Sequence, residues 1–202
     1  MLISHSFINM ITNRKYILAS SSKSRYMILK NSGFKFKQVK PLCDEELIKE
    51  KIRNKKTKPT LIAKKLSYEK AQSISRLKKY KGINIIGCDT IIYIKDKVFD
   101  KAKNMEEAKI KIKKLSGKAH KINSSLTICR NGKKIWECSE TSVVKIRKLN
   151  NNQIEKYLRT TGKVILNSVG CYQVESLGPT IIESVTGDFF NVMGLPLFKL
   201  LK

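Results

Sequence analysis

The chain has 202 residues, of which 41% are hydrophobic and 29% are charged, and its formal net charge is +26. This length and balance describe a folded chain with a substantial core and exclude an intrinsically disordered one. No apolar run reaches the roughly 18 residues of a membrane-spanning helix, so we expect no membrane partner.

The first fourteen residues precede the first recognisable element. They are mildly apolar, are interrupted by Asn9 and Asn13, and lack the basic region of a signal peptide. We therefore expect a cytoplasmic protein. Residues 1–14 are expected to form an N-terminal extension that can be disordered, followed by a single domain over 15–202. Met10 is an alternative start of translation.

Three short elements follow. A strand leads into a serine-rich loop over 15–22, a helix covers 24–33, and an alternating strand covers 34–39. Ser24 is the expected N-cap of the helix, and Gly33 is its expected C-terminal stop.

A polar segment and an apolar strand come next. Residues 44–79 are helical in pattern, with Pro59 and Thr60 at the start of an amphipathic stretch. Residues 82–94 predict a buried strand, which turns and returns over 98–103.

The second half has two clear local signals. Asn104 and Glu107 form a cap pair at a helix start, and Asn131-Gly132 predicts the tight turn of a long hairpin. The elements expected here are a helix over 105–115, strands over 119–130 and 133–149, a helix over 151–162, strands over 170–175 and 180–185, and a helix over 194–202. Strands and helices alternate while hairpins are also present, which predicts an α/β fold with a mixed sheet, flanking helices and a cleft.

The five cysteines are odd in number and match no zinc-binding spacing. We expect free thiols, as in a reducing cytosol. A bond between Cys129 and Cys138 across the hairpin is the less favoured alternative.

Asp89 is the strongest local signal of chemistry, because it interrupts an isoleucine-rich strand. A buried, unpaired carboxylate is unfavourable, so it needs a cation, hydrogen bonds or a proton. Gly87 allows close backbone approach nearby. Local sequence favours neither of two interpretations of Asp89. It is either a rigid catalytic base or metal ligand, or a structural acid bonded to backbone amides.

Other charged groups are ambiguous when each is taken alone. Serines and Arg25 surround a helix start, which suits an anion site or a simple capping loop. The acids at 44–46 suit a hard divalent cation or a helix dipole. Lys70 and Lys101 do not differ from surface lysines, and His120 suits a structural role.

The order of these segments is more specific than any one of them. "ILASSSKSR", "CDEE", "LSYEKAQ", "IIGCDT", "FDKAK", "LSGKAH", "GCYQVESLG" and "GDFFNVMGLPL" follow one another. This series resembles the Maf family, the septum-formation-associated nucleoside triphosphate pyrophosphatases, from about Tyr16 to the C-terminus.

The resemblance implies a Maf/ITPase-like fold, with a curved mixed sheet and two lobes around a cleft. It implies hydrolysis of a nucleoside triphosphate to the monophosphate and diphosphate with a divalent cation, Mg²⁺ or Mn²⁺. Family members are cytoplasmic and often homodimeric, and they are linked to removal of modified nucleotides and to arrest of cell division.

The family's functional positions carry over residue by residue. Asp89 falls on the catalytic carboxylate, a proton acceptor, and Glu45 falls on the acidic position after the second strand. We expect Glu45, together with Asp89 or Glu175, to hold the divalent cation. The substrate-binding positions fall on Ser20, Arg25, Lys70, Lys101 and Glu175. We expect Asp89 to have a metal, a water and a triphosphate as companions instead of a permanent buried partner.

The sequence departs from the family pattern at several positions. Ser24 stands where a first arginine is usual, and Ala102 stands where proline is usual. In the late motif, Asn167, Ser168 and Glu175 replace the Asp, Lys and Gln of the pyrimidine-preferring branch. Glu175 is more similar to the branch that prefers 7-methyl-GTP.

The net charge supports an alternative, a basic nucleic-acid-binding or regulatory protein on the same scaffold with little catalysis. Lysine supplies most of the 42 basic residues, whereas base-reading sites favour arginine, and the chain has no aromatic stacking motif. We therefore favour the enzyme and a compositional origin of the charge.

Overall fold

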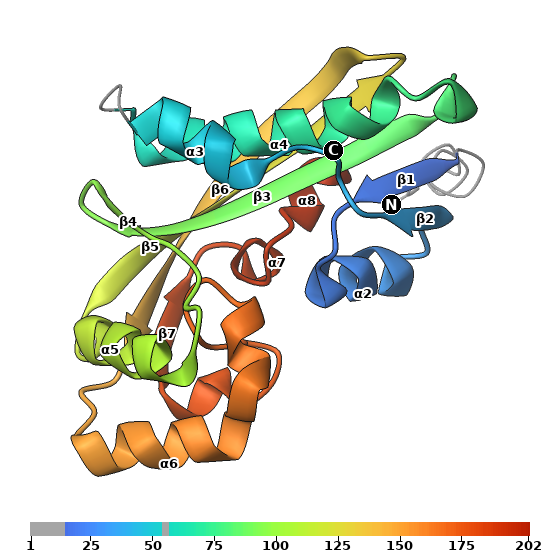
Figure 1. Ribbon diagram of the computed structural model, residues 1–202. Helices are drawn as coiled ribbons and strands as arrows, with labels where there is room; N and C mark the ends of the chain where they lie inside the picture. Colours follow the sequence, from blue (N-terminus) through green and yellow to red (C-terminus); the bar gives the residue numbers. More distant parts are fainter. Residues whose placement is uncertain (1–14, 54–56) are drawn as a thin grey trace.

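The computed structural model describes residues 15–53 and 57–202, which form a mixed sheet covered by helices (Figure 1). The expected extension over 1–14 and the alternative start at Met10 lie outside the described residues. The strands are β1 (Tyr16–Ala19), β2 (Phe36–Val39), β3 (Asn84–Ile94), β4 (Lys97–Phe99), β5 (Ala119–Arg130), β6 (Lys133–Ile146) and β7 (Ile182–Thr186). The helices are α2 (Lys23–Asn31), α3 (Glu45–Arg53), α4 (Pro59–Ser75), α5 (Met105–Leu115), α6 (Asn151–Thr161), α7 (Phe189–Val192) and α8 (Leu197–Leu200), with short 3₁₀ turns η1 (Lys78–Tyr80), η2 (Gly162–Asn167) and η3 (Gly178–Thr180).

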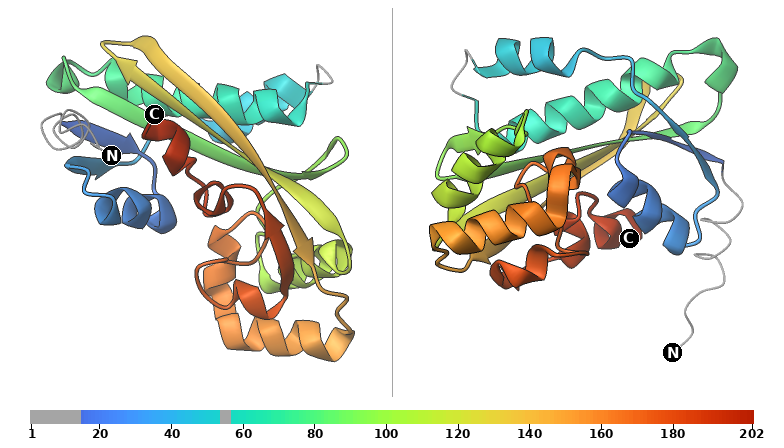
Figure 2. Two further views of the ribbon diagram at one scale, coloured as in Figure 1. Left: turned by 180° about the vertical axis from the view of Figure 1, so that it is seen from behind. Right: turned by 60° about the horizontal axis from the view of Figure 1, so that its bottom comes forward.

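The sheet confirms the predicted mixed α/β architecture. Within the described residues it has seven strands, in the order β2-β1-β3-β5-β6-β7, with β4 paired to β3. β1 is parallel to β2 and β3, and the other pairs are antiparallel. The long strands β3, β5 and β6 twist across the molecule and connect its two lobes (Figures 1 and 2).

The helices form separate layers around these long strands. α4 lies along β3 and β5 with α3 outside it, whereas α7 and α8 pack on the other face (Figure 2). α2 and β2 flank β1 in one lobe, and α5 and α6 cover the far ends of the long strands in the other. After α6 the chain returns as β7, the edge strand beside β6, and α7 then packs on β5 and β6.

β3 alternates between the two layers, as a strand with both faces buried should. Ile85 and Ile91 pack toward α4, while Ile86 packs with the α8 side. Gly87 faces α4 so closely that a Cβ atom there would lie 2.1 Å from the backbone oxygen of Ser67. The predicted close backbone approach at Gly87 is confirmed.

Local signals placed several boundaries correctly. Asn131 and Gly132 have φ values of 51° and 77° and connect β5 to β6, which confirms the hairpin turn. The Asn104 side chain accepts a hydrogen bond from the Glu107 backbone N–H at 2.9 Å, which confirms the cap of α5.

Two predictions about the first helices were wrong. The N-cap of α2 is Ser22 and not Ser24, because the Ser22 hydroxyl accepts the Arg25 backbone N–H at 3.3 Å. Ser24 then lies in the first turn, where its hydroxyl donates to the Glu175 carboxylate. The segment 44–79 is not one helical stretch, because α3 ends at Arg53 and α4 begins at Pro59.

Two predictions about the last third were also wrong. Residues 170–175 are a folded loop and not a strand, because Cys171 has a positive φ of 56° and Gly178 N–H turns back to the Gln173 carbonyl. The closing helix is only Leu197–Leu200, because Pro196 fixes its start and lacks an N–H donor.

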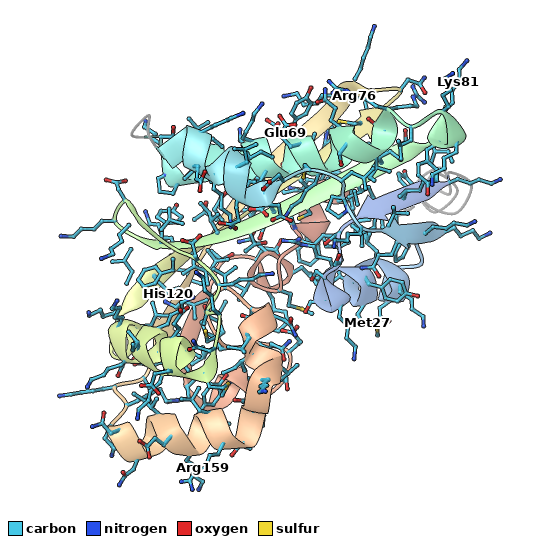
Figure 3. The ribbon with its side chains drawn as sticks, in the orientation of Figure 1. Met27, Glu69, Arg76, Lys81, His120 and Arg159 are labelled. Atoms are coloured by element: carbon cyan, nitrogen blue, oxygen red, sulfur yellow. The ribbon has the colours of Figure 1, made fainter. Side chains whose placement is uncertain are left out.

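The structure confirms the expected free thiols and the structural histidine. All five cysteines are described, and each carries a free thiol. His120, labelled in Figure 3 close to α5, is buried and shares a hydrogen bond with the Tyr172 hydroxyl. Burial lowers the pKa of His120 to about 4, so this ring is neutral at pH 7. No described helix has the length and apolar character needed to span a bilayer.

Candidate active site

A cavity of about 910 Å³ opens beside the middle of β3. β1 pairs with β3 only as far as Gly87, and β4 pairs with it from Ile92 onward. The cavity therefore lies beyond the carboxyl end of a parallel strand, where ligands commonly bind in α/β sheets. All seven residues predicted from the sequence line it: Ser20, Arg25, Glu45, Lys70, Asp89, Lys101 and Glu175.

Asp89 has a buried partner in the structure, the Lys70 ammonium, although the sequence led us to expect none. Its carboxylate accepts a hydrogen bond from the Lys70 ammonium at 2.6 Å, and both residues are buried. Lys70 lies on α4, the helix that Gly87 allows to approach β3. The same ammonium lies 2.8 Å from the carboxylate of Glu45, so one lysine bridges two acids.

The charges of this cluster stabilise one another. Burial opposes charge on Lys70, but the Asp89 and Glu45 carboxylates outweigh it and raise the Lys70 pKa above its ordinary value. Burial would likewise raise the Glu45 pKa, yet Lys70, Lys49 and Arg25 lower it. Lys70 is therefore cationic and Glu45 anionic at neutral pH.

The three acids at 44–46 have different roles, although the sequence suited all of them to a divalent cation or to the helix dipole. The Asp44 carboxylate accepts the Leu47 backbone N–H at 3.0 Å and so caps α3. Glu46 pairs with Lys49 at the surface. Only Glu45 is directed into the cavity cluster, since its carboxylate contacts Lys70.

Arg25 forms the other charged side of the cavity. Its guanidinium is buried and donates to the Ser20 hydroxyl at 3.2 Å, the Thr90 hydroxyl at 2.9 Å and the Gly194 carbonyl at 2.8 Å. These partners are all neutral, so the positive charge of Arg25 is not cancelled by them. An anion in the cavity would therefore contact the planar, charged guanidinium of Arg25, whose N–H donors form a fork of fixed orientation.

Lys101 and Glu175 lie at the cavity rim. Lys101 follows β4 and is exposed, but surrounding protein atoms and the charges of Arg25 and Lys70 lower its pKa. Glu175 lies on the loop after η2, and its carboxylate accepts the Ser24 hydroxyl at 2.6 Å. Serine in place of the usual arginine thus makes direct contact with the predicted substrate-binding acid.

Three further residues support the site and were missed from the sequence. Thr90 and the Gly194 carbonyl hold Arg25, and Lys111 joins two loops by donating to the carbonyls of Asp100 and Val169. Thr90 had a usable signal, since it adjoins Asp89 in a strand. Lys111 had none, because nothing local separates it from the many other lysines of the chain.

The cavity residues are chemically suited to a hard divalent cation. Glu45 and Asp89 supply carboxylate oxygens that already converge on one ammonium group. In the part of the chain that the structure describes, no three His, Cys, Asp or Glu side chains gather as a metal site. Two acids are enough for Mg²⁺, which takes its other oxygens from phosphates and water.

The chain is similar to known proteins over almost its whole length. A family model described as Maf-like protein matches residues 15–202. A nucleoside triphosphate pyrophosphatase of Caulobacter vibrioides is 36% identical over 184 residues, which is 91% of each chain. A 7-methyl-GTP pyrophosphatase of Brucella suis is 36% identical over 93% of each chain. Another 7-methyl-GTP pyrophosphatase, from Bartonella quintana, is 37% identical over 92% of this chain and 91% of its own.

Proposed function

The chain belongs to the Maf family, and from that premise we propose that it is a nucleoside triphosphate pyrophosphatase. Such an enzyme is a hydrolase of acid anhydrides that releases a nucleoside monophosphate and diphosphate. The observation that carries the proposal is the convergence of Arg25, Lys70, Glu45 and Asp89 on one cavity.

The cations of the cavity hold the triphosphate in this mechanism. Arg25 and Ser20 contact phosphate oxygens from the end of β1, while Lys101 reaches them from the rim. Lys70 lies between the two carboxylates and faces the same space. Fixed positive charge of this kind stabilises the negative charge that develops on the departing diphosphate.

Asp89 takes the proton of the attacking water. The water oxygen forms a bond to the α-phosphorus, and the bond from this phosphorus to the oxygen bridging to the β-phosphate breaks. The electron pair leaves with diphosphate, and the water proton passes to the Asp89 carboxylate. Its hydrogen bond to Lys70 and its place in a buried strand keep this base in one orientation.

Glu45 and Asp89 are the residues that would hold a divalent cation. A bound Mg²⁺ or Mn²⁺ would neutralise charge on the phosphates. With a cation bound there, the Lys70 ammonium would share its three N–H donors between the two acids and the phosphates.

We propose a substrate whose base carries positive charge, such as 7-methylguanine. Several relatives are named 7-methyl-GTP pyrophosphatases. Glu175 supports this preference, because its carboxylate accepts a neutral hydroxyl and pairs with no cation among the described residues. An unneutralised acid at the rim favours a cationic base over a neutral one.

Cytoplasmic location, a homodimer and roles in nucleotide clearance or division arrest are parts of the same proposal. They rest on the family resemblance. The alternative, nucleic-acid binding without catalysis, has the net charge of +26 in its favour, but it leaves the acids of the cavity without a role.

The test is a panel of triphosphates, with monophosphate and diphosphate measured separately, with and without Mg²⁺ or Mn²⁺. We expect 7-methyl-GTP to give 7-methyl-GMP and diphosphate with the highest kcat/KM. Release of orthophosphate alone, or no turnover of any triphosphate, would refute the proposed function. A pyrimidine triphosphate as best substrate would refute only the base preference.

Glu175→Gln isolates the preference, since the amide keeps the size of the carboxylate and removes its charge. We expect a loss of about ten-fold in the ratio of kcat/KM for 7-methyl-GTP to that for GTP, on the scale of one charge-assisted contact. Glu183→Gln, at an exposed position on β7, is the matched control and should leave the ratio unchanged.

A further inference from the structure

Arg25 is buried, and its guanidinium has no ion pair with a carboxylate among residues 15–53 and 57–202. Arginine carries five N–H donors. Bonds to Ser20, Thr90 and the Gly194 carbonyl use one donor on each guanidinium nitrogen. One N–H on each terminal nitrogen is left for a phosphate, so the orientation of the fork depends on these neutral acceptors.

Thr90 is in turn held by groups behind the cavity wall. Its hydroxyl lies 2.8 Å from the hydroxyl of Ser124, on the neighbouring strand β5. The Ser124 hydroxyl donates to the Asn191 carbonyl at 2.9 Å, and the Ser124 backbone N–H donates to the Asn191 side-chain oxygen at 3.1 Å. A chain of hydrogen bonds thus joins α7 to Arg25 through β5 and β3.

Asn191 fixes the far end of this chain. It is fully buried, and its amide bonds the β5 backbone on both sides of Asn123, accepting from Ser124 N–H and donating to the Ile122 carbonyl. The amide nitrogen also donates to the Ser142 hydroxyl at 2.8 Å, which donates onward to the Asp188 carbonyl. The oxygen and the nitrogen of this amide therefore both have fixed hydrogen-bond partners, which define the orientation of the side chain.

The Asn191 backbone carbonyl sets the direction of the remaining bonds, because a carbonyl can only accept. Each hydroxyl has a single hydrogen to donate. The hydrogen of Ser124 goes to the Asn191 backbone carbonyl, so the hydrogen of Thr90 points to the Ser124 hydroxyl at 2.8 Å and the Gly194 carbonyl at 3.3 Å. Thr90 then presents only lone pairs to Arg25, which is what a guanidinium donor requires.

We propose that Asn191, Ser124 and Thr90 are positioning residues that orient Arg25 for the triphosphate. This inference deepens the proposed function and rests on it. We call the hydrogen bonds that join Asn191, Ser124 and Thr90 the relay. No bond of the relay involves substrate, so these residues influence the reaction only through the orientation of the Arg25 guanidinium.

Thr90→Val tests the last bond of the chain with little change of shape. The variant leaves one guanidinium N–H without its acceptor, so the fork loses its fixed orientation. Misplacement of a charged group by about 1 Å can reduce catalysis by about 100-fold, and we expect kcat/KM to fall by about 10- to 100-fold. Thr90→Ser keeps the hydroxyl and should restore most of the activity.

Thr127→Val is the matched control. Thr127 is a sheet threonine as well, buried on β5, and its hydroxyl bonds the Ser67 hydroxyl at 2.8 Å, apart from Arg25. The control should lose stability much as Thr90→Val does and keep kcat/KM. Equal loss of activity in both variants would show a general effect of sheet stability and overturn the proposal.

A double-mutant cycle tests the relay from Ser124. If Ser124 acts only through Thr90, Ser124→Ala should lower kcat/KM in the wild-type background and have almost no further effect beside Thr90→Val. Fully additive losses would overturn the relay. The comparison needs only variants that fold, which circular dichroism and thermal unfolding establish.

Binding of inorganic triphosphate by calorimetry separates failure of this inference from failure of the proposed function. We expect weaker binding in Thr90→Val than in Thr127→Val, whatever nucleoside the enzyme prefers. A wild-type protein that binds inorganic triphosphate but hydrolyses no nucleotide would refute the function alone. Active enzyme with unchanged binding and kcat/KM in Thr90→Val would refute the inference alone.

Discussion

Lys70 lies at the centre of the charged site and contacts both of its acids. Its ammonium bonds Asp89 at 2.6 Å and Glu45 at 2.8 Å, so the buried carboxylate of β3 is paired before any ligand arrives. A buried charge is tolerated when it has such a partner. At the scale of single residues, the same contact accounts for the stability of Asp89 in an apolar strand and for its fixed direction.

Asp89→Asn should abolish most of the activity. The amide keeps the size of the side chain but cannot accept the water proton, so we expect kcat to fall by about 100- to 10,000-fold, the range of general-base catalysis. Diphosphate release measures the effect. Asp96→Asn, at the exposed β3–β4 turn, is the control and should retain activity. Wild-type turnover by Asp89→Asn would show that Asp89 is not the base.

Lys101 should set the alkaline limit of activity. Desolvation by nearby protein atoms and the charges of Arg25 and Lys70 lower its pKa below the usual lysine value, so its ammonium is lost at a lower pH than in an ordinary lysine. Because the charged form binds phosphate, kcat/KM should decline on the alkaline side before an ordinary lysine titrates. In Lys101→Arg the side chain stays charged, and the decline should move to higher pH. An unchanged alkaline limb in this variant would assign the decline to another group.

At the scale of elements, the contact between α4 and β3 positions the acid–base pair. Gly87 permits this contact, because its missing Cβ leaves room for the backbone of the helix at Ser67 and Ala71. Lys70 lies on the same stretch of α4, between these two residues. The distance from Lys70 to Asp89 therefore depends on how closely helix and strand approach.

Gly87→Ala should separate these two elements. Its Cβ would lie 2.1 Å from the Ser67 backbone oxygen and 2.6 Å from the Ala71 nitrogen, so the helix must move. We expect about 1–3 kcal/mol of destabilisation from overpacking, measured by urea unfolding, together with reduced turnover.

Gly82→Ala provides the matched control for Gly87→Ala. Gly82 has a φ of 79° and no atom within 4 Å of the added carbon, so this variant has only the strain of a left-handed backbone, about 1–2 kcal/mol. It should retain kcat/KM. If Gly87→Ala kept full activity as well, the helix–strand distance would not matter for the chemistry.

At the scale of the whole molecule, the sheet brings together segments that are far apart in the chain. The cavity takes residues from the loop after β1, from α4, from β3 and from the loop after η2. Toward the ends of the molecule, basic side chains such as Arg76, Lys81 and Arg159 project outward from different elements (Figure 3). The net charge of +26 therefore acts as a long-range field on an anionic substrate.

The field predicts a strong dependence on ionic strength. Salt shortens the screening length from about 10 Å at 0.1 M to about 3 Å at 1 M. We expect kcat/KM to fall by about ten-fold over this interval, mainly through KM, since fewer substrate molecules are drawn to the cavity. Sucrose at equal osmolality is the control and should have little effect. A kcat/KM that does not change with salt would limit the role of charge to the cavity itself.

The sequence by itself determined most of the elements, the mixed sheet and the set of candidate residues. Turn and cap signals such as Asn131-Gly132 and Asn104 act over a few residues, so the local chain is sufficient to specify them. The order of motifs was also enough to place Asp89, Lys70 and Glu45 in one site. The loop over 170–175 was predicted as a strand, because its turns depend on distant hydrogen bonds such as that from Tyr157 to the Cys171 carbonyl.

Only the tertiary structure decided which residues are partners. Lys70 lies 19 positions from Asp89, and Arg25 lies 169 positions from Gly194, yet each pair is in hydrogen-bond contact. No local pattern encodes these distances, because they follow from the approach of α4 to β3 and from the return of the C-terminal segment to the sheet. The return of the C-terminal segment also brings Asn191 to Ser124 beside the site. Neither residue is charged, so the sequence alone did not indicate a role for them.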